Sequence, residues 1–304
     1  MYDVIVIGAG TAGLTAGIYA ARANKKVLIF EKQTFGGQIL NTMKIENYPG
    51  IKKTTGPDFS MSLFEQATSF GVEIRMESVS KIEKENKKFI ITVADNNKYE
   101  TKTVIIATGL KNKTLGIENE KKFKGKGISY CATCDANFFK DKVTAVIGNE
   151  KEAIDDAILL SEHCKKVYLI NRNNIFQAEK ELVEVASKNK KIEVITDSNI
   201  TSINGDNTIE NIEIISNITK EKKTLIIDGL FITIGRGPDT FMFSNLVNTD
   251  EKGYIIADES CKTNVDGIFV AGDCRTKKLR QLVTAASDGA VAAVSINQYI
   301  INNS

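Results

Sequence analysis

The order of apolar and polar positions at the start of the chain predicts a strand, a helix and a second strand. Val4–Ile7 is a continuous apolar run, which is typical of a strand buried on both faces of a parallel sheet. An Ala-rich helical pattern extends through Ala23, and a second strand is expected over Lys26–Phe30, which is apolar from Val27 on. We therefore expect a strand–helix–strand unit of the parallel kind at the start of the chain.

The same pattern recurs in the middle of the chain. A strand over Val143–Ile147 leads through a turn into a helix that ends near Cys164, and a strand over Val167–Ile170 follows. A strand running into Gly272–Asp273 and a helix over Leu282–Ile300 close the chain. Shorter alternating segments are expected to form antiparallel strands or crossover pieces, at Phe89–Val93, Ile192–Ile195 and Ile212–Ile215.

Together these segments predict an α/β fold with two Rossmann-like domains, the second inserted into the first. We expect residues 1–112 and 242–304 to form one domain and residues 113–241 to form the other. The length of 304 residues agrees with roughly two domains. A hydrophobic fraction of 42% and a charged fraction of 26% are those of a globular protein.

Charge and composition exclude several classes of function. The 40 basic and 38 acidic side chains leave a net charge of +2, whereas nucleic-acid binders carry a basic excess. A single His leaves no material for a multi-His metal site. No window approaches the roughly 20 apolar residues of a membrane span, and the N-terminus lacks the features of a signal peptide. We expect a cytoplasmic protein without nucleic-acid, membrane or metal partners.

Glycines between the first strand and the first helix indicate a dinucleotide site. Gly8, Gly10 and Gly13 form G-x-G-x-x-G, and Glu31 follows 18 positions after the last of them. The glycines permit a tight turn and a close approach of the backbone to a pyrophosphate at the helix N-terminus. Glu31 at the end of the second strand is placed to accept hydrogen bonds from a ribose.

Motifs in a fixed order along nearly the whole chain resemble those of the small bacterial thioredoxin reductases, which are two-domain FAD proteins. These motifs are Gly8–Gly13, Gly36–Gln38, Asn47–Gly50, Ala107–Gly109, Cys131–Asp135, Ile234–Arg236 and Gly272–Asp273 through Arg280–Gln281. The resemblance implies that the first and last segments bind FAD. It also implies that the inserted segment carries a redox disulfide and, in ordinary members, an NADPH site.

For the redox chemistry, the resemblance implies roles for Cys131, Cys134 and Asp135. Cys134 would face the flavin, Cys131 would attack the disulfide of a thioredoxin, and Asp135 would move the proton. A zinc half-site is the competing interpretation of C-x-x-C, but the sequence holds no second pair or His cluster. Cys164 and Cys261 are expected to be ordinary buried residues, and Cys274, which follows Gly272–Asp273, is assigned no role.

For FAD, the resemblance implies a larger set of residues. The glycine turn would hold the pyrophosphate, Asp273 the ribityl chain, and Asn47 the flavin ring. The positive end of the last helix would stabilise the reduced flavin. The complete set is Gly8, Gly10, Thr11, Ala12, Gly13, Glu31, Gly37, Gln38, Asn47, Ala107, Thr108, Gly109, Gly272, Asp273, Arg280, Gln281 and Leu282.

The resemblance fails at the NADPH motifs. The second glycine of the family's G-x-G-x-x-A turn is Glu150 here, and a carboxylate repels the phosphates. The family's H-R-R-x-x-x-R is Asn171–Gln177 here, and of its arginines only Arg172 remains. Loss of two Arg–phosphate contacts at ~1.5–3 kcal/mol each would weaken binding by very roughly two to four orders of magnitude. We therefore expect a protein that does not use NADPH.

A subgroup that lacks these motifs, the ferredoxin-dependent flavin thioredoxin reductases, is the one that this sequence resembles. The resemblance implies electron flow from ferredoxin through FAD and Cys131–Cys134 to thioredoxin, in a homodimer. Candidate docking clusters for an acidic ferredoxin are Lys121, Lys122, Lys124 and Lys126, and Lys277, Lys278 and Arg280. Three alternatives stay open: an NADPH-dependent reductase with an atypical site, a dithiol oxidase that uses oxygen, and a non-catalytic flavoprotein.

Overall fold

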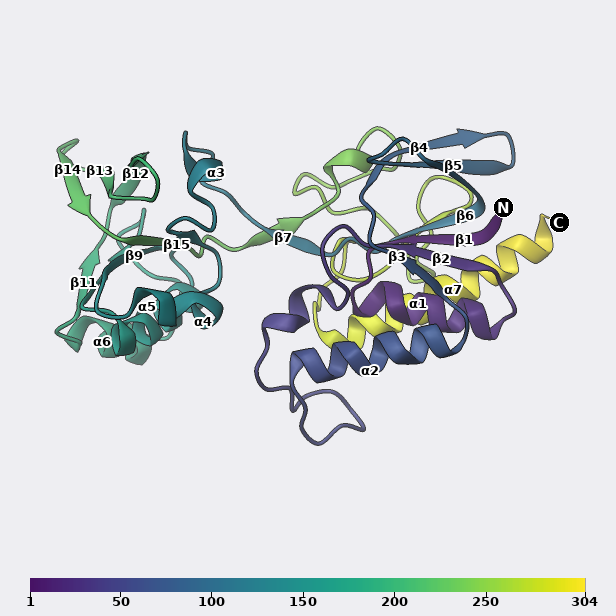
Figure 1. Cartoon of the computed structure of the whole chain (residues 1–304), viewed down its shortest axis with the longest axis horizontal. Coiled ribbons are helices and arrows are strands. Elements are labelled where there is room, and N and C mark those ends of the chain that lie inside the picture. Colours follow the sequence, from purple (N-terminus) through teal and green to yellow (C-terminus); the bar gives the residue numbers. More distant parts are fainter. Residues whose placement is uncertain (304) are drawn as a thin grey trace. The chain divides into compact units, whose positions relative to one another are not determined.

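The structure is a computed structural model that describes residues 1–303, and its chain divides into two compact units (Figure 1). The outer unit comprises Met1–Lys111 and the residues from Gly237 on, and the inserted unit comprises Asn112–Arg236. The boundaries expected from the sequence were 112/113 and 241/242. The chain passes between the units in β7 (Leu110–Asn112) and β16 (Arg236–Pro238), which pair as a two-stranded sheet.

The outer unit is built on a sheet of order β3-β2-β1-β6-β5-β4, with β17 paired to β6. β1 lies between β2 and β6 and is parallel to both, so the prediction of a parallel strand–helix–strand unit is confirmed. β5 is antiparallel to its neighbours, as expected for Phe89–Val93. The strands are β1 (Tyr2–Ile7), β2 (Val27–Phe30), β3 (Glu73–Arg75), β4 (Val79–Glu85), β5 (Lys88–Val93), β6 (Lys98–Ile106) and β17 (Ile268–Val270).

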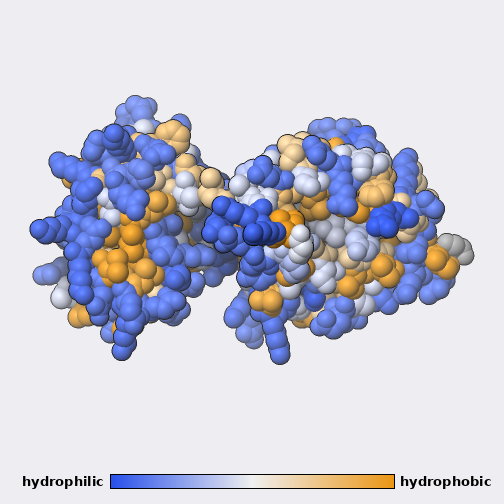
Figure 2. All heavy atoms as spheres, turned by 90° about the horizontal axis from the view of Figure 1, so that it is seen from below, coloured by the Kyte–Doolittle hydropathy of each residue, from blue (hydrophilic) through white to orange (hydrophobic). Residues whose placement is uncertain are grey.

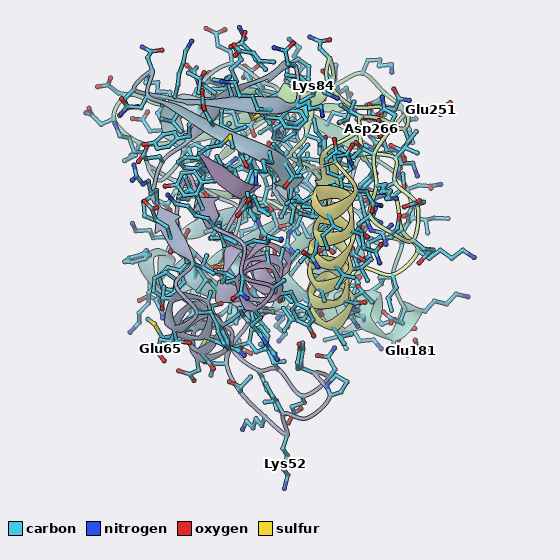
Figure 3. The ribbon with its side chains drawn as sticks, turned by 90° about the vertical axis from the view of Figure 1, so that its right-hand side faces the viewer. Lys52, Glu65, Lys84, Glu181, Glu251 and Asp266 are labelled. Atoms are coloured by element: carbon cyan, nitrogen blue, oxygen red, sulfur yellow. A yellow bond between two sulfur atoms is a disulfide. The ribbon has the colours of Figure 1, made fainter. Side chains whose placement is uncertain are left out.

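Alternation along β1 supplies both faces of this sheet with core residues. Val4 and Val6 pack in one cluster with α1 (Thr11–Arg22) and α7 (Leu282–Asn302), whereas Ile5 and Ile7 pack in the cluster on the other face. α7 lies beside α1, as Figures 1 and 3 show, and a Cβ at Gly289 would stand 2.2 Å from the carbonyl oxygen of Ala12. Glycine at 289 therefore allows the two helices to approach closely.

Other helical segments of the outer unit are α2 (Gly56–Ser69), η1 (Gly37–Asn41) and η3 (Phe241–Phe243). The loop between η1 and α2 extends away from the sheet, and Lys52 points outward from it in Figure 3. At the edge of the sheet that β4 forms, the Lys84 ammonium donates to the carbonyl oxygen of Asp266 at 3.1 Å. This contact ties the β4–β5 hairpin to the segment that precedes β17.

The inserted unit has its own parallel sheet, of order β11-β10-β9-β15-β8. Its strands are β8 (Ile128–Ser129), β9 (Val143–Ile147), β10 (Lys166–Ile170), β11 (Ile192–Ile195) and β15 (Gly229–Ile232), and its helices are α3 (Glu120–Phe123), α4 (Ala132–Asp135), η2 (Ala136–Phe139), α5 (Lys151–His163) and α6 (Lys180–Lys188). The Rossmann-like interpretation is thus confirmed for both units.

The structure decides the direction of a strand that the sequence analysis left open. Ile192–Ile195 was expected to be antiparallel or part of a crossover, and β11 pairs in parallel with β10 at the edge of the main sheet, so the crossover alternative is the one observed. The reason is that α6 forms a crossover between β10 and β11 and returns the chain in the same direction. The expectation is confirmed for Ile212–Ile215, which lies in an antiparallel sheet of β12 (Ser198–Asn204), β13 (Asn211–Ser216) and β14 (Lys222–Ile226).

Candidate functional site

The turn between β1 and α1 needs two of its glycines for the fold itself. Gly8 has φ +108°, and a Cβ there would stand 2.4 Å from the carbonyl oxygen of Ala107. A Cβ at Gly13 would stand 1.8 Å from the carbonyl oxygen of Gly8. Any side chain at either position would overlap backbone atoms, so both glycines are explained without a ligand.

Gly10 differs, because nothing in the described protein requires a glycine there. Its φ of −75° suits any residue, and a Cβ would meet no atom of the described chain nearer than 4.0 Å. It is the N-cap of α1, a helix that has no acidic residue in its first turn and no side-chain cap among the described residues. Open space at an uncapped, positive helix end fits a pyrophosphate.

The other predicted residues for the adenosine and ribityl parts converge on this turn. The Glu31 carboxylate accepts hydrogen bonds from the backbone N–H groups of Ala9 and Gln33, both at 2.9 Å. Gly272, with φ +82°, lies so near the first turn of α1 that a Cβ would stand 2.8 Å from the Cβ of Ala12. The structure therefore brings the glycine turn, Glu31 and the Gly272–Asp273 loop together.

Two residues expected beside the flavin ring also meet. The Asn47 amide donates to Oε1 of Gln281 at 3.2 Å. Gln281 is the N-cap of α7 and forms a reciprocal capping box with Thr284, so the start of this helix is held by its own side chains. Gln38 donates to the carbonyl oxygen of Leu110 at 3.2 Å, which links the η1 segment to β7.

Thr108 and Arg280 act within loops of the outer unit. Thr108 donates from Oγ1 to the carbonyl oxygen of Asp239 at 2.9 Å. Arg280 donates to the carbonyl oxygens of Asp273 and Arg275, both at 3.1 Å, and its guanidinium lies 4.0 Å from the ring centre of Tyr254. The Arg280 side chain therefore fixes the loop that carries Asp273.

This arrangement corrects one candidate docking cluster. Lys277 is buried against Asp288 at 2.7 Å, and the Arg280 guanidinium is engaged with backbone carbonyls, so of that cluster only Lys278 is exposed. The burial of Lys277 could not be read from a run of basic residues, because its partner lies on α7. The other cluster, Lys121 to Lys126, is exposed at each of its four lysines.

In the inserted unit, Cys131 and Cys134 form a disulfide with a Cα–Cα distance of 5.4 Å. Ser129, which the sequence analysis did not single out, connects this pair to Asp135. Its hydroxyl accepts from the backbone N–H of Cys131 at 3.0 Å and donates to Oδ2 of Asp135 at 2.6 Å. The predicted acid is thus held one hydroxyl group away from the backbone of a redox cysteine.

A buried carboxylate supports the strand that leads to Cys131. Glu120 is 3% exposed and accepts hydrogen bonds from the backbone N–H groups of Leu115 and Gly116 and, at 2.6 Å, from the Tyr130 hydroxyl. Burial and the neighbouring carboxylate raise the pKa of Tyr130 well above its usual value. Tyr130, the residue before Cys131, therefore stays a neutral donor and is anchored to Glu120.

The three other cysteines are buried, as expected for Cys164 and Cys261, and so is Cys274. Burial raises the pKa of Cys164, that of Cys274 to about 11 and that of Cys261 to about 12. Since the thiolate is the reactive form, these three residues are chemically inert near neutral pH.

The β9–α5 turn of the inserted unit has the same hydrogen-bonding scheme as the glycine turn of the outer unit. In the outer unit, Gly10 forms an isolated bridge with Gly36, whose N–H donates to the carbonyl oxygen of Ala9 at 2.7 Å. In the inserted unit, Glu150 forms such a bridge with Gln177, whose N–H donates to Asn149 at 2.7 Å. Glu150 therefore stands where Gly10 stands in the first turn.

The same comparison pairs Asn171 with Glu31. Each is the first residue after the second strand of its unit, and each donates its N–H to the neighbouring strand, to Ile195 and Arg75 respectively. Asn171 is fully buried, donates its amide to the carbonyl oxygen of Ile175 and accepts from the N–H of Asn173. Its side chain is thus committed to the loop that it begins.

The consequence is that the second turn lacks the open space of the first. Glu150 is the N-cap of α5 with φ −99°, and its Cβ and carboxylate extend from the position where Gly10 leaves space. Glu152 adds a second carboxylate to the first turn of α5. Carboxylates stabilise a helix N-terminus and repel phosphate from it. The single remaining arginine of this loop, Arg172, is exposed.

Comparisons with known proteins agree with this arrangement. The sequence profile of the pyridine nucleotide-disulphide oxidoreductases matches residues 2–289, and the chain belongs to that family. It is 42% identical over 308 residues to a thioredoxin reductase of Helicobacter pylori, which covers 99% of both chains. It is 38% identical over 301 residues to that of Bacillus subtilis, which covers 99% of this chain and 95% of the relative.

Solved structures give the same result. The thioredoxin reductase of Lactococcus lactis has a TM-score of 0.86 at 37% identity and covers 99% of this chain and 100% of its own. A ferredoxin-flavin thioredoxin reductase of Clostridium acetobutylicum has a TM-score of 0.54 at 28% identity and covers 99% and 98%. Within its family this chain is a flavin disulfide oxidoreductase of the thioredoxin reductase type, and its cofactor is FAD.

FAD fits the residues present in the outer unit, since the space at Gly10 and the uncapped end of α1 match its pyrophosphate. No group of three or more His, Cys, Asp or Glu side chains within residues 1–303 is arranged to hold a metal ion. Over the same residues, the helices are too short or too polar to cross a membrane.

Proposed function

We propose that this protein transfers electrons from a reduced ferredoxin, through FAD and the Cys131–Cys134 pair, to the disulfide of a thioredoxin. The observation that carries the choice of donor is Glu150, which occupies the position equivalent to the open Gly10. Bound FAD supplies the conversion of single electrons into the pair that a disulfide requires. In the overall balance, two reduced ferredoxins and two protons convert one thioredoxin disulfide into two thiols.

The second dinucleotide turn argues against NADPH on three counts. Glu150 takes the space and reverses the charge at the helix end, and Asn171 is buried and committed to its own loop. Of the arginines that bind a 2′-phosphate, only Arg172 remains. Because the β9–α5 turn keeps its hydrogen bonds, the inserted unit retains its fold although it no longer binds NADPH.

Two observations support ferredoxin as the donor. One is the similarity, at 28% identity and a TM-score of 0.54, to a reductase whose name specifies ferredoxin. The other is the run of four exposed lysines around α3, Lys121, Lys122, Lys124 and Lys126, in the inserted unit. Local positive charge steers an acidic partner even when the net charge is near zero.

We propose a separate role for each of the two cysteines in the reduction of thioredoxin. After reduction, the Cys131 thiolate attacks the thioredoxin disulfide, a mixed disulfide forms, and Cys134 then displaces the reduced thioredoxin. Asp135 exchanges the proton, and its hydrogen bond to Ser129 holds it at the cysteine pair.

Apolar surface near this pair supports a protein substrate. Phe138 follows Cys134 by four residues and is 75% exposed. Figure 2 views the inserted unit from the side of α5 and α6 and shows apolar side chains gathered on that face. Exposed aromatic and aliphatic side chains of this kind are typical of protein interaction sites.

Anaerobic stopped-flow absorbance tests the proposal. The oxidised flavoprotein is mixed with excess NADPH, with NADH, or with a reduced ferredoxin, and thioredoxin is then added. We expect flavin bleaching with ferredoxin alone, followed by the appearance of thioredoxin thiols. Fast bleaching by NADPH would contradict the proposal and restore the NADPH-dependent alternative. Bleaching by neither donor, together with oxygen consumption on addition of a small dithiol, would favour the dithiol oxidase.

A triple variant provides the matched control for the donor. Glu150→Gly, Asn173→Arg and Gln177→Arg together reopen the turn and restore cations to the loop. We expect the variant to gain NADPH-dependent bleaching that the unchanged protein lacks, while ferredoxin-dependent bleaching persists. If no NADPH activity appears, the loss of binding has a cause outside these two motifs. We also propose that the protein is a cytoplasmic homodimer, and light scattering of the purified protein tests the dimer.

A further inference from the structure

Three charged residues are buried together behind the Gly272–Asp273 loop. Arg275 binds Asp288 of α7 through two nitrogens, Nε to Oδ2 at 2.9 Å and Nη2 to Oδ1 at 3.0 Å. The Lys277 ammonium donates to the same carboxylate at 2.7 Å. The side chains of Arg275, Lys277 and Asp288 are 8%, 7% and 8% exposed.

The charges of this cluster do not cancel. Arg275 neutralises Asp288 through the bidentate pair, and Lys277 adds a second cation. Cys261 also lies against Asp288, but it adds no negative charge because burial raises its pKa to about 12. Glu259, another neighbour of Arg275, is exposed, so solvent screens it. Among Arg275, Lys277 and Asp288, the two cations therefore exceed the one carboxylate by one buried positive charge.

This cluster is connected to the first turns of two helices, α1 and α7. Asp288 Oδ2 accepts the N–H of Gly272 at 3.0 Å, and Gly272 packs against Ala12 in the first turn of α1. The Lys277 ammonium also donates to the carbonyl oxygen of Thr284, in the first turn of α7. The excess charge thus adds to the positive ends of both helices.

The loop that carries the charge is fixed from two sides. Asp288 holds it through Arg275, Lys277 and Gly272, while Arg280 donates to the carbonyl oxygens of Asp273 and Arg275. A charge held in place before a reaction needs no reorganisation when new charge develops. An excess of buried cations over buried carboxylates is costly in the protein alone, and an anionic ligand nearby relieves this cost.

We propose that Lys277 tunes the flavin site, its buried excess charge favouring the reduced form of the cofactor. Two electrons and one proton convert the neutral flavin ring into an anion, so the reduced cofactor carries one more negative charge than the oxidised one. Lys277 is a positioning residue in this role, since it acts through the field of the cluster. The proposal depends on FAD binding and is independent of which donor supplies the electrons.

The test compares two neighbouring lysines in a background that contains both Cys131→Ser and Cys134→Ser, so that the flavin is the remaining two-electron centre. Lys277→Met removes the buried charge, and Lys278→Met removes an exposed charge one residue away. The flavin potential is measured by anaerobic equilibration with redox dyes. For Lys277→Met we expect the affinity for reduced relative to oxidised FAD to fall about tenfold, which is a potential drop of about 30 mV. For Lys278→Met we expect no shift.

The Arg275–Asp288 pair and the Gly272 contact persist without Lys277, so the variant is expected to fold. If Lys277→Met nevertheless fails to bind FAD, Lys277→Gln, which keeps a donor toward Asp288, is expected to show the same drop. An unchanged potential in the Lys277 variant that binds FAD would overturn the proposal. Equal drops in the Lys277 and Lys278 variants would do so as well. An equal loss of affinity for oxidised and reduced FAD would mean that the charge of Lys277 acts on the pyrophosphate and not on the flavin ring, which would also overturn the proposal.

Discussion

Replacement of Gly10 by alanine separates what the fold needs from what the cofactor needs. Gly10 has an ordinary φ of −75°, and a Cβ would lie 4.0 Å from the nearest described protein atom, the carbonyl oxygen of Gly36. The inserted unit already carries a larger residue, Glu150, at the equivalent position and keeps the turn. We therefore expect Gly10→Ala to leave the apoprotein folded and to weaken FAD binding.

The magnitudes follow from the position of Gly10 as an N-cap. Alanine is a poorer N-cap than glycine, which destabilises the folded protein by about 0.5–1 kcal/mol. Alanine also has less conformational freedom than glycine in the unfolded chain, which stabilises the folded protein by about 0.4–1 kcal/mol. The free energy of unfolding of the apoprotein should thus change by less than about 1 kcal/mol. A Cβ that separates the pyrophosphate from one backbone N–H costs about 1.5–3 kcal/mol of binding, a roughly ten- to hundredfold rise in Kd.

Two measurements on the apoprotein check this prediction: FAD affinity from flavin fluorescence quenching, and the free energy of unfolding from urea titration. Gly8→Ala is the matched control, because its φ of +108° and a Cβ 2.4 Å from Ala107 affect the fold itself. We expect the free energy of unfolding of the Gly8→Ala apoprotein to be lower by about 1–3 kcal/mol. An unchanged Kd for FAD in Gly10→Ala would refute the assignment of this turn to the pyrophosphate.

Further predictions concern the thiols and the buried ion pair. Cys134→Ser should abolish thioredoxin reduction and leave the FAD content of the purified protein unchanged, and loss of FAD would show that Cys134 is itself needed for cofactor binding. In the native protein at pH 8, iodoacetamide followed by mass spectrometry should find three cysteines unmodified, Cys164, Cys261 and Cys274, because burial raises their pKa values. Asp288→Asn should lower the free energy of unfolding at pH 7 by about 3–5 kcal/mol, since it leaves buried cations without their carboxylate. Although burial alone would raise it, hydrogen bonds from Arg275 and Lys277 hold the pKa of Asp288 below its ordinary value of 3.8. This stabilisation is therefore complete above about pH 3.8 and disappears as the pH falls further, so the difference between the two proteins should shrink in acid.

Local pattern predicted much of the fold. Val4–Ile7 and Val143–Ile147 were recognisable as buried parallel strands because every residue of each run is apolar or small. The direction of Ile192–Ile195 stayed open, since its alternation fits an edge strand of either direction and only the α6 crossover decides between them. The direction of an edge strand depends on the connection that precedes it.

In the site, too, residues in short motifs could be predicted from the sequence, whereas residues that act through distant partners could not. The glycine motif, Glu31 and the C-x-x-C pair could be found from the sequence, because their chemistry depends on residue type and short spacing. Ser129, Glu120 and Asp288 could not, although each contacts a residue that was found or its neighbour. A serine or a carboxylate outside a motif gives no signal until the fold brings its partner to it.

Residue types and their spacing along the chain were enough to recognise the family, the cofactor turn and the loss of glycine at Glu150. Only the tertiary structure revealed that Gly10 faces open space while Gly8 and Gly13 face backbone, and that Glu150 is the counterpart of Gly10. Only it showed that Lys277, one basic residue in a run, is buried against Asp288. The physical reason is that residue type sets what a group can do, whereas burial and partners, which come from distant parts of the chain, decide what it does.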